Sequence, residues 1–495
     1  MTLSVTNTLT GEREPFEPRD PDSVLLYYCG LTVSDFAHLG HARGWVHVDV
    51  MHRWLEHLGY DVHHVENITD VNEKITARVG EDDLGDSESE VARSFVTETI
   101  RDMRSLNLRR AEVYPRVSEH VPEIIDLVET LVEKGYAYES NGSVYFDVTA
   151  FDDYGKLSNQ DVEEMEAQGA DGELAEKRHP ADFALWKADG VDEGSVEEHR
   201  DPDTDYAVDH PEGETWDSPW GEGRPGWHIE CSAMSMTHLD ETIDVHVGGQ
   251  DLVFPHHENE VAQSEAATGQ QFVRYWLHVR LLETEGEKMS SSLQNFFTVR
   301  DAVAELGANV VRMFLLSTAY DNRQTYSDDT VAEAEDRWER LSTGYDRAVD
   351  ALDGPDAGTK VEDADLRAAV EDAREAFADA MNDNFNTRRA LAALLDLVTA
   401  ANRHLDDREA FDYVGLRRTV ETFDAFGGGV LGFAFGGETE GDVRLAEDLV
   451  ELVLDVRERE REAGNYERAD ELRDELEAVG VDVQDTDSGP EFRLP

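Results

Sequence analysis

The first part of the chain alternates short apolar runs with one amphipathic segment. Residues 24–29 read VLLYYC and end at a glycine, which is typical of a buried strand. From residue 40 to 58, apolar side chains recur at helical spacing, and Gly59 is suited to end that helix. Residues 61–66 read as a second strand. A strand, a helix and a strand in this order predict a βαβ unit with a parallel sheet.

The middle of the chain departs from this pattern. Residues 88–106 and 119–134 read as amphipathic helices, and Gly135 is placed to close the second. Two β-rich runs within 136–146 flank the pair Asn141-Gly142, which is a hairpin signal.

A Gly-, Asp- and Glu-rich segment follows this hairpin. Residues 189–214 hold few apolar side chains, so we predict a solvent-exposed insertion there. The hairpin and this segment together indicate a domain that interrupts the α/β fold.

The α/β pattern then resumes and gives way to helices. Residues 243–247 and 274–279 read as further strands. Residues 256–267 have helical spacing. The later helical segments are 298–306, 309–319, 330–352, 362–382, 386–405, 415–426 and 445–479. The second half shows no strand pattern, so we interpret it as a helical binding module.

The predicted fold class is α/β. We expect a Rossmann-like parallel-sheet catalytic domain with an inserted α+β domain, followed by an all-α helical region. The expected parts are residues 1–118 and 216–285 for the two halves of the α/β domain, 119–215 for the insert, 286–353 for a polar loop and its following helices, 360–430 for the helical domain and 443–495 for a small C-terminal domain.

The net charge of the chain indicates the salt conditions in which the protein works. The chain has 110 acidic and 44 basic residues, a formal net charge of −66. An acidic coat of this kind keeps a protein hydrated in strong salt, so we expect a halophilic source. Such a charge normally argues against a nucleic-acid partner, but at molar salt the Debye length is only about 3 Å and local contacts decide.

The sequence predicts a cytoplasmic protein. The first twenty residues lack the basic and apolar regions of a signal peptide, and no apolar run approaches the ~20 residues of a membrane span. Two cysteines in 495 residues do not make a disulfide scaffold.

Candidate metal ligands gather in residues 216–260. If residues 256–267 are helical, His256 and Glu260 lie at i and i+4 and share a face. Cys231 adds a thiol, and Cys29 at the end of the first strand is a possible fourth ligand. Thiolate, imidazole and carboxylate are ligands for zinc. Two buried structural cysteines beside a solvated helix face remain the alternative.

Three motifs are suited to phosphates or a nucleotide, although each is weak alone. His38-Leu39-Gly40-His41 lies between a strand and a helix, where histidines and free amides attract phosphate. The others are Gly248-Gly249 with Asp251 after a strand, and the loop Lys288-Met289-Ser290-Ser291-Ser292.

Together these motifs strongly resemble one family. HLGH after a strand, PGWHIEC, GGQDLVFPHHENE and KMSSS occur in the order found in cysteinyl-tRNA synthetases, which are class I aminoacyl-tRNA synthetases. NTLTGEREPFEP resembles the N-terminus of that family, MNDNFNTRRALAALLDL its anticodon-side helical domain and GNYERADELRDEL its C-terminal element.

The resemblance implies ATP-dependent activation of L-cysteine and its transfer to tRNA(Cys) by a monomer. It also implies one zinc ion and ATP with Mg²⁺ as cofactors. Zinc would be held by Cys29, Cys231, His256 and Glu260; the cysteine pocket would include Trp227, Thr69 and His246; His38, His41 and Lys288 would act on the phosphates; and Gly40, Gly248, Gly249, Asp251, Ser290, Ser291 and Ser292 would bind ATP.

Zinc suits the selection of cysteine over serine, because it prefers thiolate to hydroxyl and shape alone separates the two poorly. His257 and Glu258 fall off the ligand face, and we expect them only to support the ligands from outside. We also expect arginines of the helical half, such as Arg388, Arg389 and Arg403, to contact tRNA.

The loop departs from the family pattern at one position. The usual loop is K-M-S-K-S, whereas Ser291 stands in place of the second lysine. The resemblance implies that the adenylation transition state loses a cation contact worth on the order of 1–3 kcal/mol. Either Lys288, Mg²⁺ or the helix-end amides replace that contact, or adenylation is slower.

Two other functions stay open from the sequence. One is a ligase that passes activated cysteine to a small amino sugar, which would not need the long helical half. The other is a non-catalytic regulator that binds zinc and a nucleotide.

Overall fold

The computed structural model describes residues 2–162, 165, 167, 174–201, 204–284, 287–288, 297–436 and parts of 450–493. For residues 287–288 and 482–493 it describes the backbone alone. The chain divides into two compact units, Met1–Phe433 and Ala434–Pro495.

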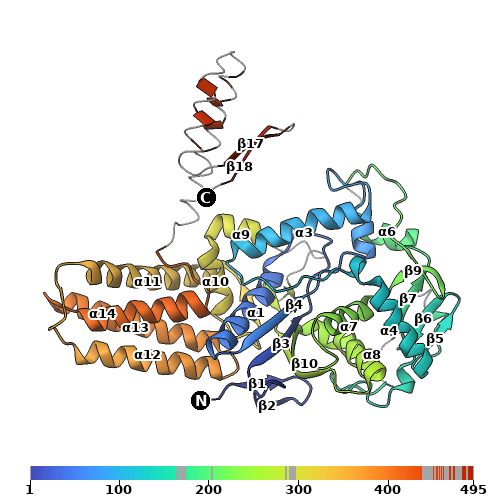
Figure 1. The fold of residues 1–495 in the computed structure, drawn as a ribbon, viewed down its shortest axis with the longest axis horizontal. Helices are drawn as coiled ribbons and strands as arrows, with labels where there is room; N and C mark the ends of the chain where they lie inside the picture. The colour runs from blue at the N-terminus through green and yellow to red at the C-terminus, as the bar shows by residue number, and fades with distance from the viewer. Residues whose placement is uncertain are drawn as a thin grey trace. The chain divides into compact units, whose positions relative to one another are not determined.

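A four-stranded parallel sheet forms the core of the first unit (Figure 1). Its order is β11 (Val273–Val279), β10 (Ile243–Gly249), β3 (Ser23–Tyr28) and β4 (Asp61–Glu66). All three pairs run parallel, with Val245 opposite Leu26 and Tyr28 opposite Glu66. The predicted βαβ unit and its two later strands are therefore confirmed.

The side chains of β3 show which helices cover which face. Tyr28 faces α1 (Leu39–His57), because a Cβ on Gly44 of that helix would lie 2.1 Å from the Tyr28 hydroxyl. Tyr27 points the other way and clusters with Cys231 of α7 (Trp227–His238) and Val261 of α8 (Glu258–Thr268). Since side chains alternate along a strand, Cys29 falls on the same side as Tyr27.

The early helices and the hairpin also follow the sequence closely. The helices α3 (Glu88–Ser105) and α4 (Val121–Lys134) match their predicted spans within two residues. Gly135 ends α4 with φ +84°, which is the left-handed conformation of a C-terminal cap. The strands β5 (Ala137–Ser140) and β6 (Ser143–Phe146) are joined by Asn141 and Gly142, both with positive φ.

The inserted domain is built on a five-stranded antiparallel sheet in the order β5, β6, β7, β9, β8. The strands that were not predicted are β7 (Phe183–Ala188), β8 (Trp216–Ser218) and β9 (Gly221–Pro225). This sheet continues past residue 215, where we expected the α/β domain to resume. Apolar residues of α4, such as Ile124 and Val128, share a core with Ile229 and Ala262 of α7 and α8.

The acidic segment 189–214 is mostly exposed, as predicted, but several of its residues contact the rest of the fold. It forms the short helix α6 (Glu193–His199), in which Val196 is buried. The guanidinium of Arg200 donates to the carbonyls of Ala77, Val79 and Val208. The segment is therefore a solvent-exposed insertion that Arg200 ties to the segment that follows β4.

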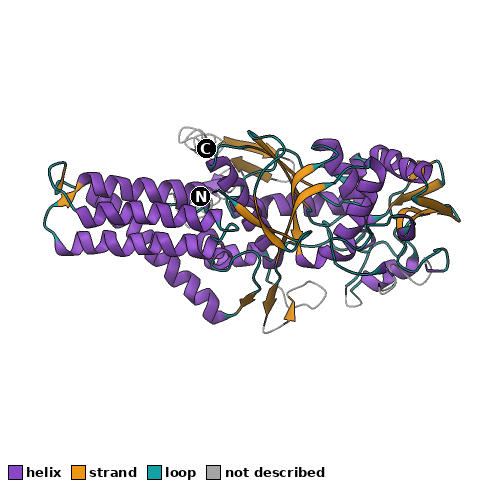
Figure 2. Ribbon diagram, turned by 90° about the horizontal axis from the view of Figure 1, so that it is seen from below, coloured by secondary structure: helices purple, strands orange, loops and turns teal. Residues whose placement is uncertain are grey.

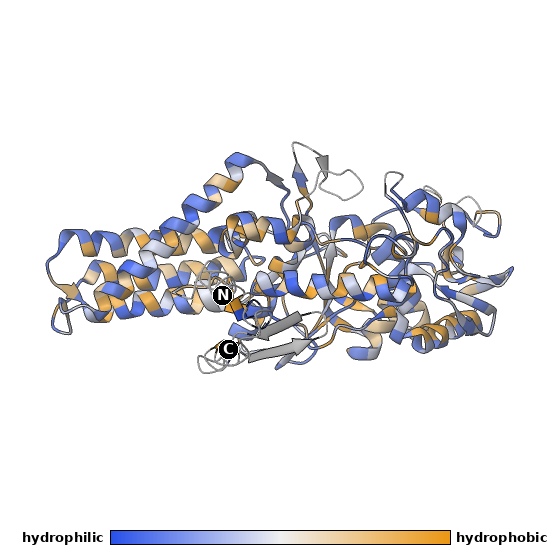
Figure 3. Ribbon diagram, turned by 90° about the horizontal axis from the view of Figure 1, so that it is seen from above, coloured by the Kyte–Doolittle hydropathy of each residue, from blue (hydrophilic) through white to orange (hydrophobic). Residues whose placement is uncertain are grey.

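The helical half begins with α9 (Val299–Leu306) and α10 (Ala308–Leu316). A helical bundle follows (Figure 2), made of α11 (Asp328–Asp353), α12 (Ala364–Asn382), α13 (Thr387–Asp407) and α14 (Tyr413–Thr422). The last helix, α14, continues into a π-helical segment, Phe423–Val430. Apolar positions lie on the inner sides of these helices and charged positions on the outer sides (Figure 3). Short strands β12 (Leu282–Thr284) and β14 (Gln324–Tyr326) pair beside β13 (Glu287–Lys288).

The second unit contains an antiparallel hairpin of β17 (Asp482–Thr486) and β18 (Gly489–Arg493), which the sequence analysis did not predict. Val450, Leu454 and Leu476 form its small apolar cluster. Among the helices that the structure describes, none has the length and apolar character of a membrane span.

A buried arginine joins the α/β domain to the helical half. Arg312 of α10 is fully buried and donates to the Asp49 carboxylate of α1 at 2.6 Å. It also donates to the carbonyls of Leu106 and Leu431. Burial acts to raise the pKa of Asp49, but Arg312 and Arg53 outweigh this and lower it, so the pair is charged.

We expect Arg312→Met to lower the free energy of unfolding by about 3–5 kcal/mol, because it leaves Asp49 buried with a reduced counter-charge. The matched control is Arg337→Met, which removes an exposed ion pair to Glu333 and should cost about 0–1 kcal/mol. Urea unfolding at molar KCl measures both, and equal losses would show that the buried pair has no special role.

Candidate metal centre and nucleotide site

Four buried side chains converge at the carboxyl edge of the parallel sheet. The ligand atoms of Cys29, Cys231, His256 and Glu260 all lie within 4.8 Å of one another. Cys29 Sγ is 3.8 Å from Cys231 Sγ and 3.5 Å from His256 Nε2, which is 3.1 Å from Glu260 Oε1. The structure therefore brings together the four side chains predicted to bind a metal.

The four candidate ligands lie on β3, α7 and α8 or directly beside these elements. Cys29 follows β3, Cys231 lies in α7 and Glu260 lies in α8. His256 precedes α8, in a π-helical turn at Val253–His257, so the predicted start of the helix at residue 256 was two residues early. The i, i+4 pairing of His256 with Glu260 is nevertheless present.

The charges of this cluster suit a cation. Burial acts to raise the pKa of Glu260, but His246 and His256 outweigh it and lower it to about 2. Hydrogen bonding to Cys29 and burial raise the pKa of Cys231. Glu260 Oε1 is buried and has no hydrogen-bond partner among the described residues. Two thiols, an imidazole and this carboxylate oxygen form a donor set that fits zinc, whose charge would hold the thiols as thiolates.

Two of the three predicted cysteine-pocket residues, His246 and Trp227, lie beside this cluster. His246 Nε2 is 3.0 Å from Glu260 Oε2, and its ring stacks on Trp276 with centroids 4.3 Å apart. The Trp227 ring lies 4.4 Å from the His256 ring and is 41% exposed, so it borders the open side of the cluster. Thr69 is buried just beyond β4 and accepts a hydrogen bond from Asn67.

The two residues expected to support the ligands from outside behave differently. His257 does contact the cluster, with Nε2 3.8 Å from Glu260 Oε1. Glu258 does not: its carboxylate accepts from the backbone amides of Gly155, Leu157 and Ser158 in the inserted domain. The expectation for Glu258 was wrong, because it points toward the insert and holds that domain in place.

Sequence reasoning missed three polar residues of the site. His228 Nδ1 lies 2.9 Å from His256 Nδ1 and so contacts the ring edge away from the cluster. The Tyr27 hydroxyl donates to Asn67 Oδ1 at 2.9 Å, and the same oxygen accepts from the Gly30 amide. The position of Asn67 beside the end of β4 was the available signal, since that edge of a parallel sheet binds ligands.

The predicted phosphate-binding histidines form the N-terminal cap of α1. His38 Nδ1 accepts from the Gly40 amide at 3.0 Å, and His41 Nδ1 accepts from the His38 amide at 3.3 Å. Their rings stack with centroids 3.8 Å apart. Since each Nδ1 is an acceptor, Nε2 carries the proton of each neutral ring, which leaves a donor suited to phosphate oxygen.

The glycines of the predicted nucleotide site have packing roles as well. A Cβ on Gly40 would lie 2.7 Å from His38 Cε1, and one on Gly248 would lie 2.3 Å from His257 Cε1. A Cβ on Gly249 would lie 2.7 Å from the Asp251 carboxylate. Gly248 and Gly249 end β10, and the exposed Asp251 follows in a short 3₁₀ turn.

The predicted phosphate loop is anchored at both ends. Lys288 lies in β13, where the structure describes the backbone alone, and Ser290, Ser291 and Ser292 lie outside the described residues. After the loop, the chain pairs with the start of α1: the Leu39 amide donates to the Phe297 carbonyl, and the Val299 amide donates to the Ala37 carbonyl. Residues 297–299 therefore lie beside the His38 turn.

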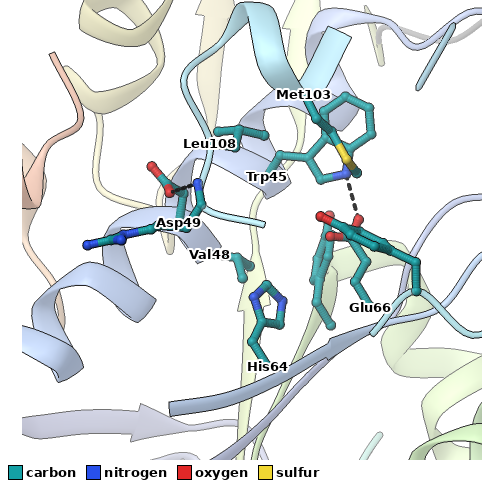
Figure 4. Close-up of a pocket in the computed structure, with 10 residues that line it drawn as sticks. Trp45, Val48, Asp49, His64, Glu66, Met103 and Leu108 are labelled. Carbon is teal, nitrogen blue, oxygen red and sulfur yellow. Dashed lines mark hydrogen bonds between the residues drawn. The ribbon is translucent and has the colours of Figure 1, made fainter. Parts of the chain in front are cut away.

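A small cavity lies between β4, α1 and α3 (Figure 4). It measures about 10 Å³, roughly the volume of one water molecule. Glu66 lines it, and Trp45 Nε1 donates to that carboxyl at 2.9 Å. Burial raises the pKa of Glu66 to about 8. This cavity is too small for a substrate and does not compete with the cluster.

Comparisons with known proteins agree with this geometry. Residues 15–336 match the family described as tRNA synthetases class I (C) catalytic domain, residues 376–436 the DALR domain, and residues 446–493 the cysteinyl-tRNA ligase anticodon binding domain. The solved structure of Mycobacterium tuberculosis methionyl-tRNA synthetase with methionyl-adenylate has a TM-score of 0.58 at 17% identity, covering 83% of this chain and 89% of that one. The fold and the matched domains define a class I aminoacyl-tRNA synthetase.

Proteins of similar sequence show which family within this class the chain belongs to. The chain is 74% identical to cysteine–tRNA ligase of Haloarcula marismortui and 64% identical to that of Halobacterium salinarum, with full coverage of both chains in each case. The ligase of Geobacter sulfurreducens is 44% identical, again with full coverage of both. The chain belongs to the cysteine–tRNA ligase family, and the two haloarchaeal relatives support the expected halophilic source.

We expect Gly40→Ala to slow cysteine-dependent ATP–pyrophosphate exchange by about ten- to hundredfold, because the added methyl group displaces the His38 ring. If the effect passes through His38, the double variant Gly40→Ala/His38→Ala will be no slower than His38→Ala. If the loss of exchange rate in the double variant equals the product of the two single losses, the effect of Gly40→Ala does not pass through His38.

Proposed function

We propose that this enzyme selects L-cysteine with a zinc ion held by Cys29, Cys231, His256 and Glu260, activates it with ATP and transfers it to tRNA(Cys). The reaction class follows from family membership. The observation that supports the selection step is the convergence of four buried ligand atoms within 4.8 Å at the edge of the sheet.

The chemistry of the ligands explains why a metal serves selection. When bound, zinc offers a soft Lewis acid that takes up a substrate thiolate far more readily than a hydroxyl. Trp227 would close the pocket over the substrate, since its ring already lies beside His256 at the open side. His246 would hold Glu260 in place through its hydrogen bond to Oε2.

The ATP phosphates would bind at the start of α1. His38 and His41 would donate from Nε2, and the helix N-terminus would add its free amides. Lys288 would approach on the loop that returns to this turn, together with Ser290, Ser291 and Ser292. Gly248, Gly249 and Asp251 would contact the adenosine, and Mg²⁺ would neutralise phosphate charge.

The tRNA partner would be contacted in part by the helical half. Arg388 and Arg403 are exposed and have no ion pair among the described residues. Arg389 is instead paired with Asp383 at 2.6 Å, so it is a weaker candidate than we expected from the sequence. We further propose a cytoplasmic monomer.

Cys231→Ser should lose bound zinc and cut cysteine-dependent ATP–pyrophosphate exchange by about hundredfold or more, because one of the two thiolate ligands is gone. Metal content and exchange rates with cysteine and with serine measure this. Met236→Leu on the same helix is the control for general damage. Full activity with no bound zinc would defeat the proposal.

Ser291→Lys should leave the rate of cysteine adenylation unchanged or raise it by up to about tenfold, because it restores a cation beside the departing pyrophosphate. Ser292→Lys, which adds the same charge one residue further on, is the matched control. A large loss of exchange in Ser291→Lys alone would show that Ser291 has a role of its own.

A further inference from the structure

One stretch of this acidic chain is basic. Residues 93–110, which span most of α3 and the turn after it, contain five arginines and two acidic residues. The whole chain has 110 acidic residues against 44 basic ones. Selection for an acidic surface would remove such a local excess unless it had a use.

The arginines of α3 lie on its outer face. Val91, Phe95 and Met103 are buried, so that side of the helix packs on the α/β domain. Arg93 and Arg104 are exposed, and their spacing of eleven residues places them on one stripe about 16 Å long.

The two acids of this stretch are already neutralised. Glu98 accepts a hydrogen bond from Arg101 at 2.7 Å and forms an ion pair with Arg300 of α9 at 2.8 Å. Asp102 is buried and lies 3.7 Å from Arg300. The stripe therefore presents positive charge without a competing carboxylate between Arg93 and Arg104.

Within the described part of the chain, the side chains of Arg93 and Arg104 lack the paired carboxylate that many other arginines have. Arg337 and Arg347, for example, are held by Glu333 and Asp406. The guanidinium of neither Arg93 nor Arg104 has a hydrogen bond, ion pair or ring contact among the described residues. Two outward guanidiniums that no neighbouring side chain engages are suited to phosphate groups.

We propose that the outer face of α3 binds the phosphate backbone of the tRNA, through Arg93 and Arg104. The inference rests on the proposed function, which supplies the RNA. In molar salt, long-range repulsion by the acidic surface is screened within about 3 Å, so local arginine–phosphate contacts decide where RNA lies.

The position of α3 fits this partner. The helix runs along the outside of the first unit, from beside α9 toward α6 and the inserted domain (Figure 1). Arg93 lies at the edge of the stripe, where it lines a hollow together with Asp82, Asp83, Asp86 and Glu90. These acids repel phosphate, so the RNA contact ends at Arg93 and extends from there toward the helical half.

The test is Arg93→Gln/Arg104→Gln in the full-length enzyme, assayed with transcribed tRNA(Cys) over a range of KCl. We expect the KM for tRNA to rise about tenfold with kcat unchanged, and the slope of log KM against log[KCl] to fall by about 1.5 for two lost contacts. Arg93→Lys/Arg104→Lys keeps the charges and should restore most of the affinity.

The matched control is Arg13→Gln/Arg19→Gln, which removes two charges from exposed arginines that are paired with Asp383 and Asp240. It should leave the KM for tRNA and the salt slope unchanged. Equal effects of the two double variants, or an unchanged KM in the α3 variant, would overturn the proposal.

Cysteine-dependent ATP–pyrophosphate exchange without tRNA separates this inference from the proposed function. The α3 variant should keep the wild-type exchange rate, since it touches neither the metal cluster nor the His38 turn. A parallel loss of exchange and tRNA binding would mean a structural role for the stripe, and would also overturn the proposal. Absence of exchange in the wild-type enzyme would overturn the proposed function instead.

Discussion

The burial of Glu260 among two thiols and two imidazoles is the constraint on which the rest of the site depends. A carboxylate fully removed from water is costly unless opposite charge or metal compensates it. Here His246 and His256 hold one oxygen each, at 3.0 and 3.1 Å, and the cysteine sulfurs lie on the same side as His256. The protein thus brings together four buried ligand groups that could hold a metal ion.

The parallel sheet joins this pocket to the nucleotide site. The strand β3 ends at Cys29, and the chain then leads directly into the His38 turn and α1. β10 ends at Gly248 and Gly249, with His257 packed against Gly248. In the proposed function, selection of the amino acid and binding of ATP would therefore use the same strand ends, and a shift of either strand would disturb both. Arg312 and Asp49 fix the helical half to the back of the same helix.

The sequence predicted the elements that local periodicity or turn chemistry determines. The span of β4 and the Asn141-Gly142 hairpin were recognisable because a two-residue period and a positive-φ pair leave little choice. The antiparallel strands β7 and β9 were missed, because their pairing is set by residues far apart along the chain. The ligand set came from the order of family motifs, since spacing alone left Cys29 open.

The supporting contacts could not be predicted in the same way. Helical spacing places Glu260 on the ligand face and Glu258 off it, but nothing in the local sequence shows that Glu258 holds the inserted domain. Likewise, Gly40 reads as a phosphate-approach glycine, while the structure shows that the His38 ring itself needs the space. Such roles depend on which side chains tertiary packing brings together.

The central claim is that the metal itself recognises the cysteine thiol. Zinc K-edge X-ray absorption of the purified enzyme, alone and with each amino acid, tests it most directly. With Cys29 and Cys231 as the protein's sulfur ligands, the account predicts that the number of sulfur neighbours rises from two to three with cysteine and stays at two with serine. A zinc environment that cysteine does not change would contradict it.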